Sequence, residues 1–222
     1  MKSTILALCL TGAAVAAAAQ TPGTITIAQL QYGGGGDWYA NPTALTNLLK
    51  EIRTRTGIPV TTEPATTRLT DPALWSYPIL HMTGHGNVRF TEEDVRTLRR
   101  YLEAGGFLHA DDNYGLDTSF RREIRKVFPE AELRELPPDH PIYTIFYRFE
   151  GGLPKIHRHD GKPPQGFGIF HRGRLVVYYT YETDLGNGWE DAETHDDPPE
   201  VRERAFRMGV NIFMFALSQV TT

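Results

Sequence analysis

Apolar residues along the first 130 positions switch between short continuous runs and helical spacing. An apolar run at 24–31 predicts a first strand, and a glycine-rich loop over 32–42 follows it. Apolar residues then recur every three or four positions, so we expect a helix that is capped by Asn41, has Pro42 at its first position and ends at Gly57. The later elements of this part are predicted as strands at 58–62, 77–83 and 107–110 and as helices that start near 91 and 117. We expect a capping box over 91–94 at the start of the first of these helices, and Asp117 or Thr118 as the cap of the second.

The later part of the chain has a different pattern. Two apolar runs, 166–170 and 174–181, flank a short polar turn and predict an antiparallel hairpin, and a final helix is expected over 199–219. Strands that alternate with helices over short connections are typical of a parallel sheet with helices on both faces. We therefore predict an α/β fold: a three-layer, mostly parallel doubly wound sheet with an antiparallel hairpin addition, in a single domain over 24–220.

The first 19 residues predict a secretory signal peptide. Lys2 gives a short positive start, an apolar run covers 5–15, and the small residues at 17–19 form a cleavage site. The run is shorter than the roughly 20 residues of a membrane-spanning helix, and a retained N-terminal anchor is the alternative. We expect an exported protein, periplasmic or extracellular, with no membrane span after cleavage. Cleavage also removes Cys9, so the mature chain has no thiol for a disulfide, a metal site or a nucleophile.

Composition narrows the class of protein without naming its chemistry. Of the 222 residues, 40% are hydrophobic and 23% are charged, which is ordinary for a globular protein and argues against a collagenous, coiled-coil or disordered chain. The formal net charge is −4, so no global charge draws the chain to nucleic acid or to anionic lipid. The partner that we expect is a small polar ligand or another envelope protein.

The loops that follow the predicted strands form the candidate site, because ligands of open α/β sheets bind beyond the carboxyl ends of the strands. The glycine-rich loop could cradle an anion with its backbone N–H groups. It does not match the dinucleotide fingerprint, because Trp38 stands where the third glycine is required. The candidate ligand-binding residues are Tyr32, Gly34, Gly35, Asp37, Trp38, Gly84, Asn113, His140 and Asp184.

Three further residues are the candidate catalytic groups. His85 lies between two glycines at a strand-to-helix turn of the kind that presents a nucleophile, and its imidazole would serve as a general base or a metal ligand. Asp111 and Asp112 follow a buried strand and could share a proton or hold a cation. Because neighbouring residues at a strand end point to opposite sides, we expect only one of the two to face the site.

The other histidines give no firm site. His140 lies between prolines in PPDHPIY, where a rigid loop could aim it at the site. His157 and His159 could bind a metal together with Asp160, but their spacing is a loose match to known sites. His109 is expected in the core. We therefore predict no cofactor and no metal site, with a divalent metal as the alternative.

Five segments of the chain carry a family resemblance. They are YGGGGDWYANP (32–42), YPILHMTGHG (77–86), YLEAGGFLHADD (101–112), DHPIY (139–143) and GRLVVYYTYETDLGNGWE (173–190). They resemble an uncharacterised bacterial family of domains of unknown function, over about residues 25–217. That family occurs in exported or membrane-associated proteins and is grouped with class I glutamine amidotransferase-like folds, so the resemblance implies such a flavodoxin-like sheet. Residues 105–108 are also similar to the trehalose-utilisation-like branch of that superfamily.

The sequence departs from the amidotransferases at the nucleophile. Their catalytic cysteine lies at a strand-to-helix elbow, whereas the turn that corresponds here reads Thr83-Gly84-His85-Gly86. The chain has no G-x-S-x-G pattern that would offer a serine instead. Hydrolysis of glutamine by a thiol is therefore excluded for the mature chain, whatever the fold.

Two functions remain open. We favour a non-catalytic module that binds a small polar ligand or a partner protein in the crevice where the amidotransferases have their active site. The alternative is a hydrolase, with or without a metal, in which His85 is the base or a ligand and Asp37, Asp111 or Asp112 holds water or a divalent cation. Either function requires Asp37, His85 and Asp112 to meet at one rim of the sheet.

Overall fold

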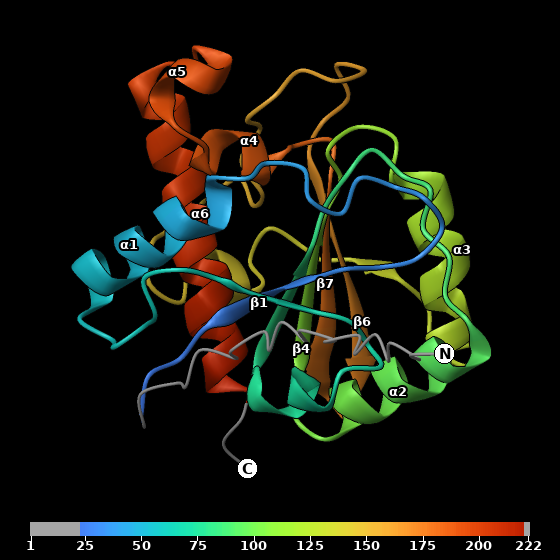
Figure 1. Cartoon of the computed structure of the whole chain (residues 1–222). Helices are drawn as coiled ribbons and strands as arrows, with labels where there is room; N and C mark the ends of the chain where they lie inside the picture. Colours follow the sequence, from blue (N-terminus) through green and yellow to red (C-terminus); the bar gives the residue numbers. More distant parts are fainter. Residues whose placement is uncertain (1–22, 220–222) are drawn as a thin grey trace, which may run out of the picture.

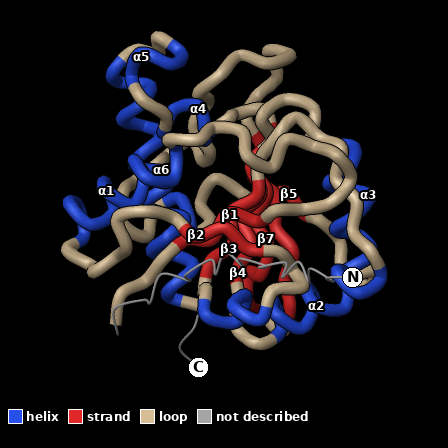
Figure 2. Tube along the Cα trace, viewed as in Figure 1, coloured by secondary structure: helices blue, strands red, loops and turns tan. Residues whose placement is uncertain are grey.

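The computed structural model of the chain describes residues 23–219 and has a seven-stranded mixed sheet at its centre (Figures 1 and 2). In the order in which they lie in the sheet, the strands are β2 (Ala65–Thr67), β1 (Ile27–Leu30), β3 (Ile79–Met82), β4 (Phe107–Asp111), β7 (Arg174–Tyr181), β6 (Gln165–His171) and β5 (Arg134–Glu135). Neighbours from β2 to β7 are parallel, whereas β6 pairs antiparallel with both β7 and β5. The predicted α/β sheet, mostly parallel with an antiparallel hairpin, is confirmed.

The order of the five parallel strands creates a switch point between β1 and β3. The chain runs from β1 outward to β2, then returns past β1 to β3, β4 and β7. This is the winding order of flavodoxin-like sheets, in which ligands bind beyond the carboxyl ends of the strands at the switch point. The topology therefore points to the loops after β1, β3, β4 and β7.

Helices cover both faces of the sheet. Within the described residues the α-helices are α1 (Ala44–Thr56), α2 (Glu92–Glu103), α3 (Asp117–Val127), α4 (Leu185–Trp189), α5 (Ala192–His195) and α6 (Pro199–Ser218), and two 3-10 helices are η1 (Pro72–Ser76) and η2 (Pro141–Tyr143). Helices α1, α4 and α6 lie on one face, and α2 and α3 lie on the other (Figure 1).

Successive residues of a strand enter different cores, because side chains alternate between the two faces of a sheet. Ile79 and Phe107 pack with α1 and α6, whereas Leu80 and Leu108 pack with α2 and α3. The strands are buried on both faces, which explains why they appear in the sequence as continuous apolar runs.

Two of the predicted element boundaries are wrong. Helix α1 begins at Ala44 with Thr43 as its N-cap, so Asn41 is not the cap; Asn41 instead has a left-handed backbone (φ 58°) and directs its amide to other loops. The predicted strand at 58–62 is only an isolated bridge between Ile25 and Val60, and the edge strand β2 forms further along the chain.

The starts of the next two helices have different outcomes. Thr91 forms the predicted capping box with Asp94 at the start of α2. Helix α3 was expected to be capped by Asp117 or Thr118, and this prediction is wrong. The carboxylate of Asp112 instead accepts the N–H groups of Gly115 and Leu116, the two residues just before that helix.

Two features bear on the N-terminal prediction. Across residues 23–219, none of the helices has the length and apolar character that a membrane span requires. The predicted signal peptide, residues 1–19, lies outside the described part of the chain.

Candidate functional site

The loops after β1, β3 and β4 pack against one another through their backbones. A Cβ atom at Gly36 would collide with the carbonyl of Gly86, and one at Gly86 would lie 2.7 Å from Gly115 O. Because glycine has no side chain, these three loops approach more closely than any other residue would allow. The glycine-rich segment thus serves loop packing, and it brings the carboxyl ends of the strands to one rim.

A ring of polar side chains joins four loops at this rim. The amide of Asn41 donates to Asn187 Oδ1 (2.5 Å), and Asn113 lies between Asn41 and Asp184. Asn187 also lies 3.3 Å from Nδ1 of His157, and that atom is 3.9 Å from Asp184 Oδ2. We call these five residues the polar ring.

The amides of the polar ring are linked head to tail. In one orientation the amide nitrogen of Asn113 donates to Asn41 Oδ1, and in the other it donates to Asp184 Oδ2, in both cases at 2.6 Å. When Asn113 turns, Asn41 must offer its amide nitrogen to Asn113 instead of its oxygen. Asn187 must then turn too, so that its amide nitrogen faces the oxygen of Asn41. The side chains of Asn41, Asn113 and Asn187 thus form one continuous chain of amides between Asp184 and His157.

The acidic pair lies beneath the surface. Asp111 is fully buried and accepts the Thr180 hydroxyl (2.5 Å) and the Gly186 N–H (2.7 Å). Burial and the negative charge of Asp184 raise the pKa of Asp111 to about 7. Burial likewise raises the pKa of Asp112 to about 6. Both carboxylates hold loops in place, so the structure aims neither of them at solvent.

His85 pairs with Asp37 in the surface part of the rim. The carboxylate of Asp37 accepts the His85 backbone N–H (2.7 Å) and lies 2.6 Å from its Nδ1. Burial alone would raise the pKa of Asp37, but these bonds from His85 lower it below its usual value. The His85 side chain is 56% exposed. Among the described residues no hydrogen bond connects this dyad to Asp111 or Asp112.

Tyr32 and Trp38 have packing roles beside this dyad. The Tyr32 hydroxyl donates to Thr83 O (3.0 Å), and burial raises the pKa of that hydroxyl far above its usual value. Trp38 meets Tyr39 edge to face and packs on the core beneath α2 and α3. Gly34 accepts the Asn87 amide (2.9 Å), and Gly35 has a left-handed φ of 83° at the exposed tip of the loop.

His140 is not brought to the rim. It caps η2 and packs against Phe170 and Phe215, near the turn from β6 to β7 at the opposite edge of the sheet. Burial lowers the pKa of His140. The rigid proline-flanked loop therefore places this imidazole within a packing contact.

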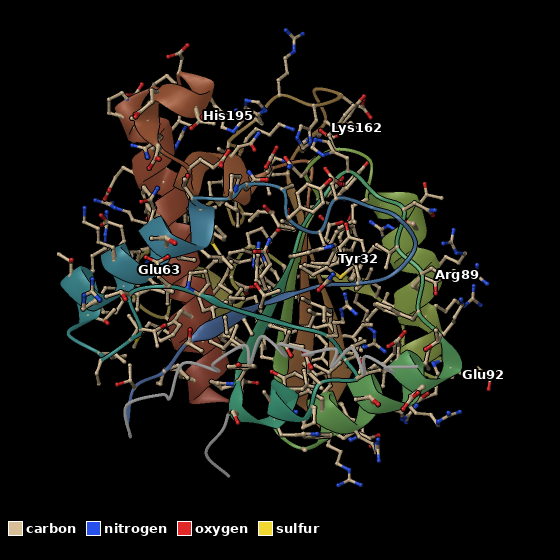
Figure 3. The ribbon with its side chains drawn as sticks, in the orientation of Figure 1. Tyr32, Glu63, Arg89, Glu92, Lys162 and His195 are labelled. Atoms are coloured by element: carbon tan, nitrogen blue, oxygen red, sulfur yellow. The ribbon has the colours of Figure 1, made fainter. Side chains whose placement is uncertain are left out.

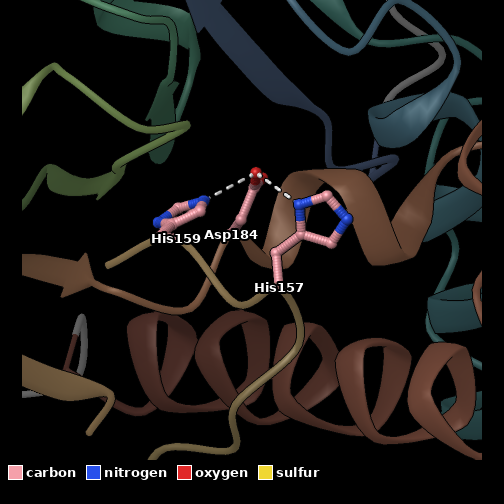
Figure 4. A group of neighbouring side chains, drawn as sticks. All are labelled: His157, His159 and Asp184. Carbon is pink, nitrogen blue, oxygen red and sulfur yellow. Dashed lines mark hydrogen bonds and ion pairs between the residues drawn. The ribbon is translucent and has the colours of Figure 1, made fainter. Parts of the chain in front are cut away.

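Two histidines meet Asp184 instead of Asp160 (Figure 4). Nε2 of His159 is 3.2 Å from Asp184 Oδ2, and one ligand atom from each of His157, His159 and Asp184 lies within 4.8 Å of the others. The predicted grouping with Asp160 is wrong, because its carboxylate binds the Tyr114 hydroxyl (2.9 Å) and Lys162. Burial opposes protonation of His159, yet the bond to Asp184 raises its pKa.

The loop that carries these histidines is bonded to the residues that directly follow β7. His157 donates its backbone N–H to Thr183 O (2.8 Å), and the ammonium of Lys155 lies 2.8 Å from the buried carboxylate of Glu182. Lys162 and His195 lie at the same end of the molecule (Figure 3). Only the rule that strand ends meet could have indicated this cluster, since 25 residues separate His159 from Asp184.

Comparison with known proteins gives a family and no activity. No curated protein matches the chain. The model of one family, described as a domain of unknown function (DUF4159), matches residues 26–217, which include every strand of the sheet and all four loops of the rim. The chain therefore belongs to the DUF4159 family.

Proposed function

We propose that this domain is an exported binding module that recognises a small polar ligand at the carboxyl edge of its sheet. The observation that carries the proposal is the polar ring, in which side chains from four loops are hydrogen-bonded in fixed positions. Buried amides and carboxylates with a fixed geometry bind a ligand that completes their hydrogen bonds more tightly than one that leaves them unpaired.

Recognition is favoured over nucleophilic catalysis because three hydroxyl groups at the rim are already hydrogen-bonded to other groups. Thr180 donates to Asp111, and Thr183 donates to Pro154 O at 2.5 Å. Ser119 donates to Leu116 O while accepting the Val88 N–H. Along residues 23–219, none of these hydroxyls is bonded to His85, the imidazole that would have to activate it.

A thermal-shift screen tests the binding function. Carboxylates, phosphate esters and sugars are added to the wild-type protein and to Asn187→Ala, which removes one amide of the polar ring. Glu92→Ala is the control, because Glu92 is 96% exposed on α2. We expect at least one compound to raise the melting temperature of the wild type and of the control, but not of Asn187→Ala. Equal shifts in all three proteins, or none in the wild type, would contradict the proposal.

A hydrolase is the second candidate, and the His85–Asp37 dyad favours it. By holding Nδ1–H, Asp37 leaves Nε2 of His85 free to take a proton from water at the exposed surface. Turnover of chromogenic esters or phosphate esters that is lost in His85→Gln and reduced in Asp37→Asn would establish this function. The absence of turnover in the wild type would reject it for those substrates.

Export is part of the proposal and has its own test. The predicted signal peptide ends at Ala19, so the exported protein should begin at Gln20. N-terminal sequencing of protein recovered from the cell envelope or medium checks this expectation. Full-length protein confined to the cytoplasm would contradict it.

A further inference from the structure

We propose that His157, His159 and Asp184 bind one divalent first-row transition-metal ion. The inference deepens the proposed binding function, on which it rests, by naming the ligand at the Asp184 end of the polar ring. Two imidazoles and one carboxylate are the donor set of Zn²⁺ sites that keep an open position, and of Fe²⁺ sites of the two-histidine, one-carboxylate type.

The distances fit such an ion. Two ligands of a tetrahedral zinc ion, each about 2.0–2.1 Å from the metal, lie roughly 3.4 Å apart. Nε2 of His159 is 3.2 Å from Asp184 Oδ2, and Nδ1 of His157 is 3.9 Å from the same oxygen. A small rotation of the half-exposed His157 ring closes the second distance, and it replaces the 3.3 Å contact with Asn187.

The charges beside the cluster also call for a cation. The carboxylates of Glu182 and Asp184 are buried together at this end of the sheet. The one ammonium group bonded to them among the described residues is that of Lys155, which forms an ion pair with Glu182. Buried carboxylates require a compensating positive charge, and a divalent ion on Asp184 provides it without a further basic side chain.

Two of the three ligands, Asp184 and His159, are held in position before any ion binds. Asp184 stands in a left-handed conformation at the N-terminus of α4, where its Oδ1 accepts the Asn187 N–H (3.2 Å). The His159 side chain is 4% exposed, and its Nδ1 has no hydrogen-bond partner, so Asp184 supplies its hydrogen-bonding contact. Ligands fixed in this way lose little entropy when the metal binds.

Solvent reaches the cluster from the side of His157. A surface hollow of about 550 Å³ is lined by the loop from Lys155 to Pro164, and His157 lies on its wall. The fourth coordination position is thus available to water or to a polar molecule. A bound ion would in this way join the metal site to recognition of a small ligand.

Metal titration of the full chain tests the inference. The protein is made without a histidine tag, stripped with a chelator and titrated with Zn²⁺ and with Co²⁺, with elemental analysis of the protein as purified. We expect one ion per chain. His159→Gln and Asp184→Asn should each lower the affinity by more than the roughly 10–100-fold loss that follows removal of a group hydrogen-bonded to a metal ligand.

Two further variants complete the test. His157→Gln alters a side chain that is 40% exposed, so it keeps the fold while weakening the binding. His171→Gln, at the end of β6 on the opposite edge of the sheet, should leave the affinity unchanged. A wild type that binds no stoichiometric ion, or a His159→Gln variant with wild-type affinity, overturns the metal site. Because the titration contains no small molecule, its failure leaves the thermal-shift test of the proposed function undecided, and the two results stay separable.

Discussion

The imidazoles of His81 and His109 face each other through their Nδ1 atoms, 3.1 Å apart, in the core beneath the polar ring. His109 continues through Nε2 to the Thr180 oxygen (3.1 Å), and Thr180 donates to Asp111. These contacts assign the hydrogens: His109 carries its proton on Nε2 and accepts at Nδ1, so His81 donates from Nδ1. His109 is therefore neutral, and burial keeps His81 neutral as well, because it disfavours the charged imidazole.

We predict that this pair of histidines makes the folded protein less stable at acidic pH. Burial lowers the pKa of His81 to about 3, and burial together with His81 holds the pKa of His109 well below its usual value. A folded-state pKa below the unfolded value near 6.5 means that stability is full above pH 6.5 and is lost as the pH falls, because the unfolded chain takes up the protons. The loss approaches roughly 1.4 kcal/mol per pH unit for each histidine.

Urea unfolding at pH 7, 6 and 5 checks this. The double variant His81→Leu with His109→Leu should lose less stability than the wild type over this range, whatever its stability at pH 7. The control is His171→Leu, which changes the last residue of β6 and should retain the wild-type slope. Parallel curves for the wild type and the double variant would contradict the assignment.

We predict that substitution of Glu123, at a contact between α3 and the loop before α2, lowers the stability of the protein. The Glu123 side chain is 1% exposed and accepts the Phe90 N–H (2.9 Å) and the Lys126 ammonium (2.6 Å). We expect Glu123→Gln to lower the free energy of unfolding at pH 7 by about 1–3 kcal/mol. The exposed Glu92, changed to Gln, should stay within about 0.5 kcal/mol of the wild type.

The effect of Glu123 should also depend on pH. Burial alone would raise its pKa, but the bonds from Lys126 and Phe90 lower it below its usual value. A lowered folded-state pKa gives stability that is present above the unfolded pKa, near 4.3, and is lost as the pH falls through the folded value. The difference between the wild type and Glu123→Gln should therefore shrink below pH 4, and a constant difference would be evidence against it.

We expect two substitutions of Asp112 to lower the stability of the protein by different amounts. Its Oδ1 accepts the N–H groups of Gly115 (3.1 Å) and Leu116 (2.8 Å) at the start of α3. Asp112→Ala removes both hydrogen bonds and should lower the free energy of unfolding by about 0.5–2 kcal/mol, whereas Asp112→Asn keeps an acceptor oxygen and should lose less. Chemical denaturation at pH 7 compares them, and equal losses would show that the acceptor oxygen contributes nothing.

We predict that Lys155 and Glu182 are coupled in their contributions to the free energy of unfolding. Removing the ammonium in Lys155→Met leaves the buried Glu182 carboxylate uncompensated, with an expected loss of about 3–5 kcal/mol. Adding Glu182→Gln removes the charge and should restore part of the stability. A double-mutant cycle by urea unfolding measures the coupling, and simple additivity of the two changes would refute the ion pair.

The sheet was predictable because its strands obey local rules. Continuous apolar runs such as 77–83 and 107–110 are bounded by glycines or polar residues, and the resulting strands β3 and β4 lie within or very near those limits. The two-residue strand β5 has no such signal, since Arg134 and Glu135 are exposed and pair only because β6 lies beside them. Tertiary contacts decide elements of that length.

The site was predictable only in part. The rule that ligands bind beyond the carboxyl ends of parallel strands predicted a site in the loops at that edge of the sheet. These loops carry Asp37, His85, Asn113 and Asp184, and the structure brings them together. The roles of Asn41 and His159 follow from left-handed backbone conformations, at φ 58° and 42°, that turn their side chains toward the rim. Such conformations are chosen by the assembled fold, so a linear pattern does not reveal them.

The contact between Asn41 and Asn187 spans 146 positions of the chain. Neither an N-terminal fragment ending at α3 nor a C-terminal fragment starting at β6 contains both partners, so the rim cannot form on a partly synthesised or clipped protein. A ligand held there bridges the beginning and the end of the domain, and mass action then adds its binding free energy to the stability of the whole molecule. Occupancy would thereby report that folding is complete.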